Sequence, residues 1–247
     1  MELTGAVAVV TAGGGGLGAH LVHALAREGC HVVVADRDAD AAARVAEEVR
    51  DGGGRATDVR CDVLVDDDLR ALVDLTRGLG GVDLLVANAG GWGGASEQYP
   101  GAEVGDWSAV LDLNLRAPML LLQLCLPSMR ARGTGAVVTV ASSAGVEAGA
   151  YGSPPYAAAK AGLVRITTSL ADLGAEGVRV TTVVPGWIGL DRAHREWDAL
   201  PEDERAGLPA LVPPSLVAAE VVALARDGAG GRVVTLLDGE RREVLHP

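Results

Sequence analysis

Short valine-rich runs alternate along the chain with longer stretches of helical character. Short apolar runs are typical of strands that are buried on both faces of a sheet. The expected strands are residues 6–10, 31–35, 57–60, 82–87, 135–140, 178–183 and 232–237. The expected helices are residues 16–29, 38–51, 66–79, 106–131, 154–174 and 215–227.

A chain that repeats strand and helix in this way builds βαβ units. Their right-handed crossovers place helices on both faces of a mostly parallel sheet. We therefore expect residues 1–247 to form a single α/β domain, a doubly wound Rossmann-type fold with a seven-stranded sheet.

Residues 187–214, WIGLDRAHREWDALPEDERAGLPALVPP, depart from this pattern. They form a long insertion after the sixth predicted strand, at its carboxyl end, where folds of this kind bind ligands. We expect a substrate lid, and a solvated surface excursion is the alternative.

Composition narrows the classes of function. Aromatic residues make up 3% of the chain and phenylalanine is absent, so Val, Leu, Ala and Ile must build the core. The net charge of -12 argues against nucleic acid or membrane partners. Cys30, Cys61 and Cys125 form no metal-ligand spacing, so we expect no metal and buried free thiols in a reducing compartment.

The N-terminus runs directly into a predicted strand, which argues against a signal peptide. The most apolar helical stretch, residues 119–126, is bounded by prolines and is too short to span a bilayer. These features predict a cytoplasmic protein.

The run TAGGGGLG, residues 11–18, follows the first predicted strand and opens the first predicted helix. Two dinucleotide-binding templates match it. One is G-x-G-x-x-G from Gly13, and the other is T-G-x-x-x-G-x-G from Thr11 with Ala12 replacing the first glycine. In either register, backbone N–H groups at the helix N-terminus would face a pyrophosphate. A flexible turn is the alternative.

Asp36 ends the second predicted strand. A carboxylate there can accept hydrogen bonds from the adenosine ribose hydroxyls. It would repel the 2′-phosphate of NADP by about 4 kcal/mol at about 4 Å and a surface-like dielectric. We therefore expect NAD rather than NADP as the cofactor, unless Arg37 compensates the phosphate charge.

Tyr156 and Lys160 stand four residues apart in a predicted helix, and so on one face of it. An ammonium near a phenol lowers the pKa of the phenol and prepares it for general acid–base catalysis. The alternative is a chance pair on a solvated helix. Tyr151 has Pro155 at the corresponding position and so lacks such a partner.

Taken together, the motifs resemble those of the short-chain dehydrogenase/reductase family over nearly the whole chain. They are the glycine loop, Asp36, Asp62-Val63, Asn88-Ala89-Gly90, Asn114, Ser143, Tyr156-x-x-x-Lys160 and Pro185-Gly186, in the family's order. The resemblance selects the Thr11 register and implies an oxidoreductase that interconverts a secondary alcohol and a ketone.

The resemblance also implies the roles of the catalytic residues. Tyr156 exchanges a proton with the substrate oxygen, and Lys160 lowers the pKa of Tyr156 and holds the nicotinamide ribose. Ser143, thirteen residues before Tyr156, holds the substrate oxygen, whereas Ser142 points elsewhere. Asn114 anchors a water in a proton relay to Lys160, and its alternative is a helix-interior amide bonded to backbone.

Cofactor contacts follow in the same way. The implied set is Thr11, Gly13, Gly16, Leu17, Gly18, Asp36, Arg37, Asp62, Val63, Asn88, Ala89, Gly90, Tyr156, Lys160, Pro185, Gly186 and Ile188. Within this set Asn88 holds the central strands together near the cofactor, Asp62 faces the adenine, and Pro185 and Gly186 shape the wall near the nicotinamide.

Three places depart from the family pattern. Ala12 adds a methyl group to the glycine loop, and Leu190 stands where the family often has a threonine that bonds the carboxamide. The C-terminus lacks the usual Asp-Gly-Gly, which bears on subunit contacts. Family members are commonly homotetramers, with dimers next, and we expect the same here.

The resulting prediction is an NAD(H)-dependent alcohol–ketone oxidoreductase. The alternatives are an NADPH-dependent biosynthetic ketoreductase and a non-catalytic dinucleotide-sensing protein. Five aromatic residues would line an apolar or flat substrate pocket: Trp92, Tyr99, Tyr151, Trp187 and Trp197.

Overall fold

The computed structural model describes residues 1–93, 97–227 and 229–246. Eight strands form one sheet in the order β3-β2-β1-β4-β5-β6-β7-β8. Their bounds are β1 Val7–Thr11, β2 His31–Asp36, β3 Arg55–Arg60, β4 Leu84–Ala87, β5 Gly135–Val140, β6 Val178–Pro185, β7 Val233–Leu236 and β8 Arg242–His246. Neighbouring strands from β3 to β7 are parallel, which confirms the predicted doubly wound sheet.

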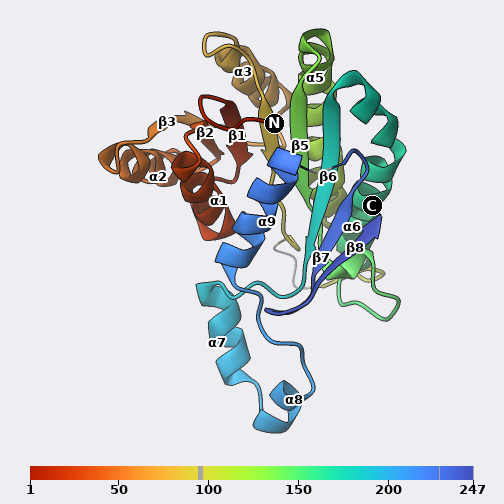
Figure 1. Ribbon diagram of the computed structural model, residues 1–247. Helices are drawn as coiled ribbons and strands as arrows, with labels where there is room; N and C mark the ends of the chain where they lie inside the picture. The colour runs from red at the N-terminus through yellow and green to blue at the C-terminus, as the bar shows by residue number, and fades with distance from the viewer. Residues whose placement is uncertain (94–96, 228, 247) are drawn as a thin grey trace.

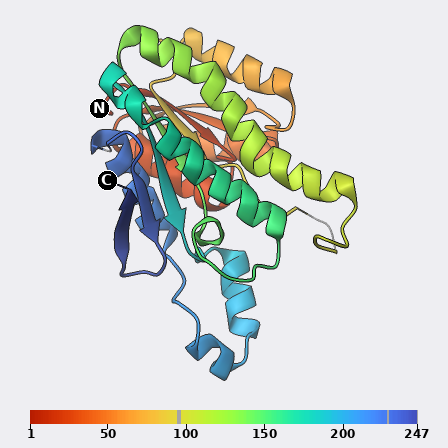
Figure 2. The same cartoon turned by 90° about the vertical axis from the view of Figure 1, so that its right-hand side faces the viewer.

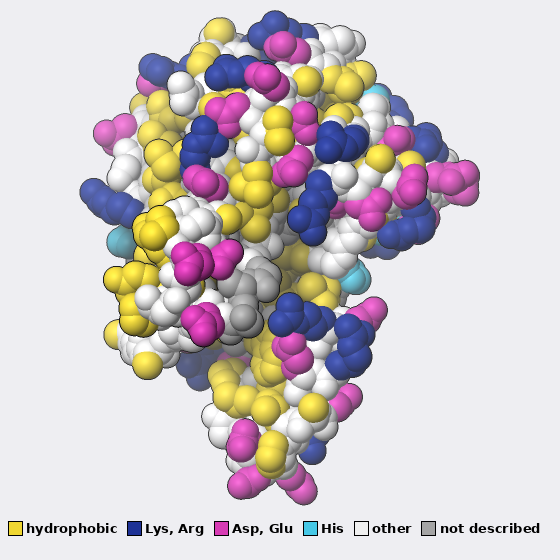
Figure 3. All heavy atoms as spheres, turned by 180° about the vertical axis from the view of Figure 1, so that it is seen from behind, with side chains coloured by type: hydrophobic (Ala, Val, Ile, Leu, Met, Phe, Trp, Pro, Cys, Tyr) yellow, Lys and Arg dark blue, Asp and Glu magenta, His cyan; other side chains and the backbone are white. Residues whose placement is uncertain are grey.

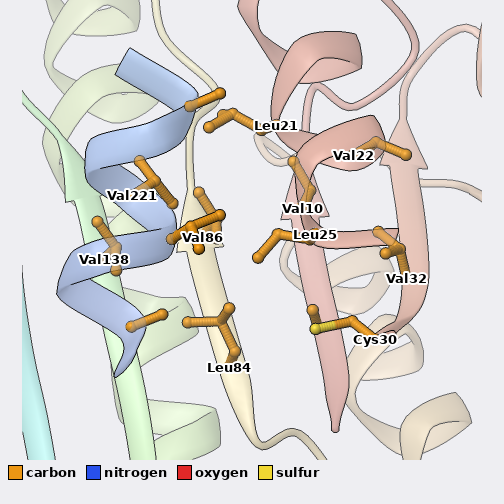
Figure 4. Close-up of a cluster of buried hydrophobic side chains, with 14 of the residues drawn as sticks. Val10, Leu21, Val22, Leu25, Cys30, Val32, Leu84, Val86, Val138 and Val221 are labelled. Carbon is orange, nitrogen blue, oxygen red and sulfur yellow. The ribbon is translucent and has the colours of Figure 1, made fainter. Parts of the chain in front are cut away.

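Helices cover both faces of the sheet (Figures 1 and 2). They are α1 Gly16–Arg27, α2 Ala39–Asp51, α3 Asp66–Arg77, α4 Val104–Leu111, α5 Ala117–Arg132, α6 Pro154–Ser169, α7 Asp191–Ala199, α8 Glu202–Ala206 and α9 Pro214–Asp227. Helices α1, α2 and α9 pack on one face, where Val10, Leu21 and Val221 belong to the same buried cluster (Figure 4). Helices α3 and α5 cover the other face. Both clusters are aliphatic, as the composition predicts.

β8 was not predicted. It pairs antiparallel with β7 and adds an eighth strand to the expected seven. All five of its residues are exposed, and its sequence REVLH carries charges instead of a valine-rich run. An edge strand can be charged because only one of its sides meets the sheet.

The predicted helix over residues 106–131 is interrupted. A π-helical segment, Asp112–Arg116, joins α4 to α5, so that the helical stretch runs from Val104 to Arg132. This stretch has 29 residues and is long and apolar enough, by length and composition, to cross a membrane. The prediction that the helix around residues 119–126 is too short to span a bilayer is therefore wrong. Here the stretch is a packed layer of the domain, because α5 lies against α3 and β5.

Residues 187–214 project from the body beyond the carboxyl ends of the strands, carrying α7 and α8 (Figures 1 and 2). A bridge between Ile188 and the buried Val212 closes the base of this insertion. Hydrophobic side chains face the hollow between the insertion and the body (Figure 3). All three cysteines are free and buried, as predicted.

Candidate active site

A cavity of about 270 Å³ opens at the carboxyl edge of the sheet. It lies between the glycine loop, the ends of β4, β5 and β6, the start of α6 and the base of the insertion. Its lining residues are Ala12, Gly15, Leu17, Gly18, Asn88, Gly90, Val140, Ala141, Ser142, Tyr156, Lys160, Pro185, Gly186, Ile188 and Leu190. The structure therefore brings together residues from both halves of the chain.

The backbone of the glycine loop favours the Thr11 register. Gly16 has a φ of +51°, and Ala12 has a φ of 50°, a left-handed conformation that glycine adopts more readily than alanine. A Cβ on Gly18 would lie 1.8 Å from the carbonyl oxygen of Ala12. Gly15, which only the Gly13 register requires, has open space around its Cα. A Cβ on Gly13 would also be crowded, at 2.9 Å from Val34 Cγ1. The open space at Gly15 and the left-handed φ values at positions 12 and 16 are therefore what separate the two registers.

Thr11 and Asn88 join the ends of β1 and β4. The Thr11 hydroxyl accepts hydrogen bonds from the backbone N–H groups of Asn88 and Ala89, at 3.1 and 3.0 Å. The side-chain amide of Asn88 donates to the Thr11 carbonyl at 2.9 Å. Asn88 therefore holds the central strands together beside the glycine loop, as predicted.

Asp36 is positioned against the glycine loop. One of its carboxylate oxygens accepts a hydrogen bond from the N–H of Gly14, and the other accepts from the N–H of Asp38, both at 3.0 Å. Arg37 is exposed. Arg44 on α2 donates to the Gly14 carbonyl at 3.0 Å, so a guanidinium also lies at this end of the site. Arg44 could not be predicted from the sequence motifs, because it stands in the middle of a helix, away from every one of them.

Only some of the predicted cofactor residues line the cavity. Asp62 accepts a hydrogen bond from the N–H of Leu64 in the turn after β3, and Val63 is buried. Thr11, Gly13, Gly16, Asp36, Arg37, Asp62, Val63 and Ala89 are not among the residues that line the cavity. The nine other predicted cofactor residues line it: Leu17, Gly18, Asn88, Gly90, Tyr156, Lys160, Pro185, Gly186 and Ile188.

Lys160 is the only lysine in the sequence, and the structure buries it almost completely. Its Nζ donates to the carbonyl oxygen of Val140 at 2.8 Å and lies 5.5 Å from the centroid of the Tyr156 ring. Burial lowers the pKa of Lys160 to about 8, because an apolar surrounding disfavours the ammonium. The site thus holds an amine that can lose its proton near neutral pH.

The expected lowering of the Tyr156 pKa by Lys160 is wrong for this structure. Burial raises the pKa of Tyr156, and a hydrogen bond with the Ser142 side chain opposes that shift. Tyr156 is half-buried beside the buried Lys160, and the apolar surrounding disfavours the charged form of each. The phenol is therefore held in its protonated, proton-donating form at neutral pH.

Ser142, and not Ser143, lines the cavity beside Tyr156, which corrects the expectation for both serines. β5 ends at Val140, but the chain stays extended through Ser142, whose φ is -165° and ψ 153°. Only then does it turn into a short 3₁₀ helix, Ser143–Gly145. Val140, Ala141 and Ser142 all line the cavity, so this extended segment forms part of its wall.

Asn114 is fully buried in the π-helical segment. Its side-chain oxygen accepts from the N–H of Gly91 at 3.0 Å, and its amide donates to the carbonyls of Gly91 and Val110, both at 2.8 Å. The side chain is thus bonded to backbone, as the alternative interpretation held. A Cβ on Gly90 would lie 2.8 Å from Asn114 Oδ1 and 3.0 Å from Lys160 Nζ, so only glycine allows both groups to approach.

Leu190 connects the insertion to the glycine loop. Its Cδ1 lies 3.5 Å from where a Cβ on Gly16 would stand. An apolar contact therefore occupies the place where the family often has a threonine. Trp187 and Trp197 contact one another at the base of the insertion, with ring centroids 5.8 Å apart.

Among the described residues, no group of three or more His, Cys, Asp or Glu side chains is placed to hold a metal ion. This finding concerns residues 1–93, 97–227 and 229–246 only.

Comparisons with known proteins agree with this geometry. The family model described as short chain dehydrogenase matches residues 6–200. The chain is 36% identical over 193 residues to 7alpha-hydroxysteroid dehydrogenase of Escherichia coli (strain K12), covering 77% of this chain and 74% of that protein. It is 38% identical over 241 residues to cis-4-hydroxycyclohexanecarboxylate dehydrogenase of Sinomonas cyclohexanicum, covering 94% and 93%.

Solved structures give the same result. The structure of 7 alpha-hydroxysteroid dehydrogenase complexed with NADH and 7-oxo glycochenodeoxycholic acid superposes with a TM-score of 0.85 at 32% identity. That match covers 97% of this chain and 95% of the other.

Proposed function

Because the chain belongs to the short-chain dehydrogenase family, we propose that it interconverts a secondary alcohol and a ketone with NAD(H), using Tyr156 as the acid–base. Family membership makes it an NAD(P)-dependent oxidoreductase that acts on CH–OH groups. One observation carries the finer proposal. Ser142, Tyr156 and the buried Lys160 meet at one end of a cavity whose other end is the N-terminus of α1.

The residues at the glycine-loop end fit a dinucleotide. The start of α1 offers backbone N–H groups to a pyrophosphate, and Gly15 and Gly18 carry no side chain where it would pass. The Asp36 carboxylate would accept hydrogen bonds from the adenosine ribose hydroxyls. When bound, the nicotinamide supplies or accepts the hydride.

The proton is handled by the chain itself. In ketone reduction Tyr156 donates its phenolic proton to the substrate oxygen, and in alcohol oxidation it takes that proton back. Ser142 hydrogen-bonds the same oxygen and holds it against the phenol. Lys160 would hold the nicotinamide ribose beside Tyr156. Asn114 would anchor a water in a proton relay to Lys160, with its side chain fixed by hydrogen bonds to the backbone of Gly91 and Val110.

Asp36 supports NAD over NADP, because a 2′-phosphate would meet its carboxylate. Arg44 is the specific observation that favours the second candidate, an NADPH-dependent ketoreductase. Its guanidinium lies within hydrogen-bonding distance of the same loop and, together with Arg37, would attract that phosphate.

We further propose a cytoplasmic homotetramer, or failing that a dimer, that takes small-molecule alcohols or ketones and binds neither nucleic acid nor membranes. The long helical layers of α4–α5 and α6 and the last strands would supply the subunit contacts. Residues 187–214 would act as a lid over the substrate, since their base lines the cavity through Ile188 and Leu190.

Titration of the purified protein with NADH and with NADPH, followed by tryptophan fluorescence, tests the cofactor assignment. We expect NADH to bind at least about tenfold more tightly, a difference of about 1.4 kcal/mol. Asp36→Ala should reduce the preference for NADH over NADPH, whereas Arg44→Ala should increase it. Equal or tighter binding of NADPH by the wild type would make the NADPH-dependent ketoreductase the better assignment.

A further inference from the structure

The aromatic residues of this chain are gathered at one edge of the sheet. The sequence holds four tryptophans, three tyrosines and no phenylalanine. Every one of them follows the carboxyl end of β4, β5 or β6: Trp92, Tyr99, Trp107, Tyr151, Tyr156, Trp187 and Trp197. None belongs to the buried aliphatic clusters. Packing of the core therefore does not explain where the aromatic residues lie.

Trp92 is the residue that links this aromatic group to the reaction centre. Its ring centroid lies 6.2 Å from that of Tyr156 and 5.3 Å from that of Tyr151. It is nevertheless 47% exposed, although it packs against two rings. A large aromatic surface left open beside a reactive group is typical of a binding site.

A second cavity, of about 90 Å³, begins on Trp92. Tyr99 and Trp107 form its far wall, edge to face, with ring centroids 6.5 Å apart. Pro155, the residue before Tyr156, lines it as well. The second cavity therefore adjoins the surroundings of Tyr156 through Trp92 and Pro155.

Charge distinguishes the second cavity from a purely apolar pocket. Glu97 and Asp106 are among its lining residues, and none of the described lining residues is Lys, Arg or His. An anionic group placed there would meet like charges without a cation to compensate them. Rings of Tyr and Trp, in contrast, bind apolar rings and attract cations through their faces.

We propose that the second cavity holds the distal part of the substrate, and that the substrate is a ring-bearing ketone or alcohol whose far end is uncharged or cationic. Trp92 is then the specificity-determining residue, because the substrate passes over its face to reach Tyr156. This inference rests on the proposed alcohol–ketone function of the same site.

Three cyclohexanones that differ only at C4 test the proposal: one bears a phenyl group, one a dimethylammonium group and one a carboxylate. Their kcat/KM values are measured with saturating NADH. Their binding is measured separately by ligand-observed NMR in the presence of NAD⁺, with which a ketone cannot react. The variants are Glu97→Gln combined with Asp106→Asn, Trp92→Leu, and Glu103→Gln as the matched control, since Glu103 lines neither cavity.

In the wild type we expect the carboxylate compound to have a kcat/KM and a binding affinity each about tenfold lower than those of the phenyl compound, which corresponds to about 1.4 kcal/mol. The double variant should reduce this ratio to within about threefold, and Glu103→Gln should leave it unchanged. Trp92→Leu should weaken binding of the phenyl compound and leave NADH binding unchanged.

Equal or tighter binding of the carboxylate, no change in the double variant, or no binding of any of the three compounds would overturn the proposal. If the binding order holds but no ketone is reduced, the alcohol–ketone function fails while the assignment of the second cavity stands. The two failures are therefore distinguishable.

Discussion

The two ends of the main cavity are built in different ways. At the glycine-loop end the backbone does the shaping, since Gly16 and Ala12 take left-handed conformations and Gly18 has no room for a Cβ. At the other end, side chains meet in an apolar surrounding, and loss of solvent shifts the pKa values of the half-buried Tyr156 and the buried Lys160. The glycine-loop end thus depends on positions that have no room for a side chain. The end with Tyr156 and Lys160 depends on surroundings that disfavour charged side chains.

This difference predicts that changes at the reaction end alter turnover and the pH dependence of stability, whereas changes at the glycine end alter stability through backbone geometry. Tyr156→Phe is expected to have the largest effect, because it removes only the hydroxyl that exchanges the proton. Turnover should fall by about 10²–10⁴-fold. Steady-state kinetics with NADH measure the loss, and fluorescence titration should show unchanged NADH binding. A variant that kept its turnover would exclude Tyr156 as the acid–base.

Lys160→Met should make the protein more stable at pH 7. The folded pKa of Lys160 is about 8 and the ordinary value is 10.5, so the unfolded chain binds more protons between these values. Wild-type stability therefore rises with pH across this window, and below it the buried ammonium costs up to about 3 kcal/mol. Urea unfolding at pH 7 to 10.5 should show a gain for the variant that shrinks from about pH 8 upwards.

The single lysine also allows a direct check. In protein labelled with ¹⁵N-lysine, the side-chain signal belongs to Lys160 alone. Its titration midpoint should lie at about pH 8. A midpoint near the ordinary value would mean that the amine is solvated and that the stability gain has another cause.

At the glycine end, Gly18→Ala and Gly15→Ala form a matched pair. A methyl group at position 18 would collide with the Ala12 carbonyl, so the loop must shift, and we expect a loss of about 1–3 kcal/mol in the free energy of unfolding. At Gly15 the backbone is extended and the space is open, so the change should stay within about 0.5 kcal/mol. Similar losses at both positions would contradict the Thr11 register.

Ala12→Gly should have a smaller effect than Gly18→Ala and the opposite sign. Removing the strain of the left-handed backbone at Ala12 stabilises the folded state by about 1–2 kcal/mol. The greater conformational freedom of glycine in the unfolded chain offsets about 0.5–1 kcal/mol of this gain. A net gain of about 0.5–1 kcal/mol in urea unfolding is expected. A loss would mean that the Ala12 methyl group makes contacts that outweigh its strain.

Most of the fold could be predicted because hydrophobic periodicity reports directly on buried parallel strands. All seven predicted strands are present, and their ends lie within two residues of the predictions. β8 could not be predicted, since an exposed edge strand such as REVLH needs no apolar pattern. The π-helical segment at Asn114 was missed for a related reason. A shift in backbone bonding leaves the apolar spacing almost unchanged.

The site divides in the same way. The glycine loop, Asp36 and the Tyr156–Lys160 pair could be found because each depends on local spacing. The choice between Ser142 and Ser143 depends instead on how far the chain stays extended beyond β5, and Arg44 depends on how α2 packs against the loop. The pKa of Tyr156 depends on burial, which no spacing encodes.

The most direct test of the reaction centre is the turnover of Ser142→Ala beside that of Ser143→Ala, each with its NADH affinity measured. Loss of a hydrogen bond to the reacting oxygen should lower kcat of Ser142→Ala by about 10²–10³-fold. Ser143→Ala should stay within about threefold of the wild type, and both variants should bind NADH normally. A large loss in Ser143→Ala with an active Ser142→Ala would contradict the reaction centre described for Ser142, Tyr156 and Lys160.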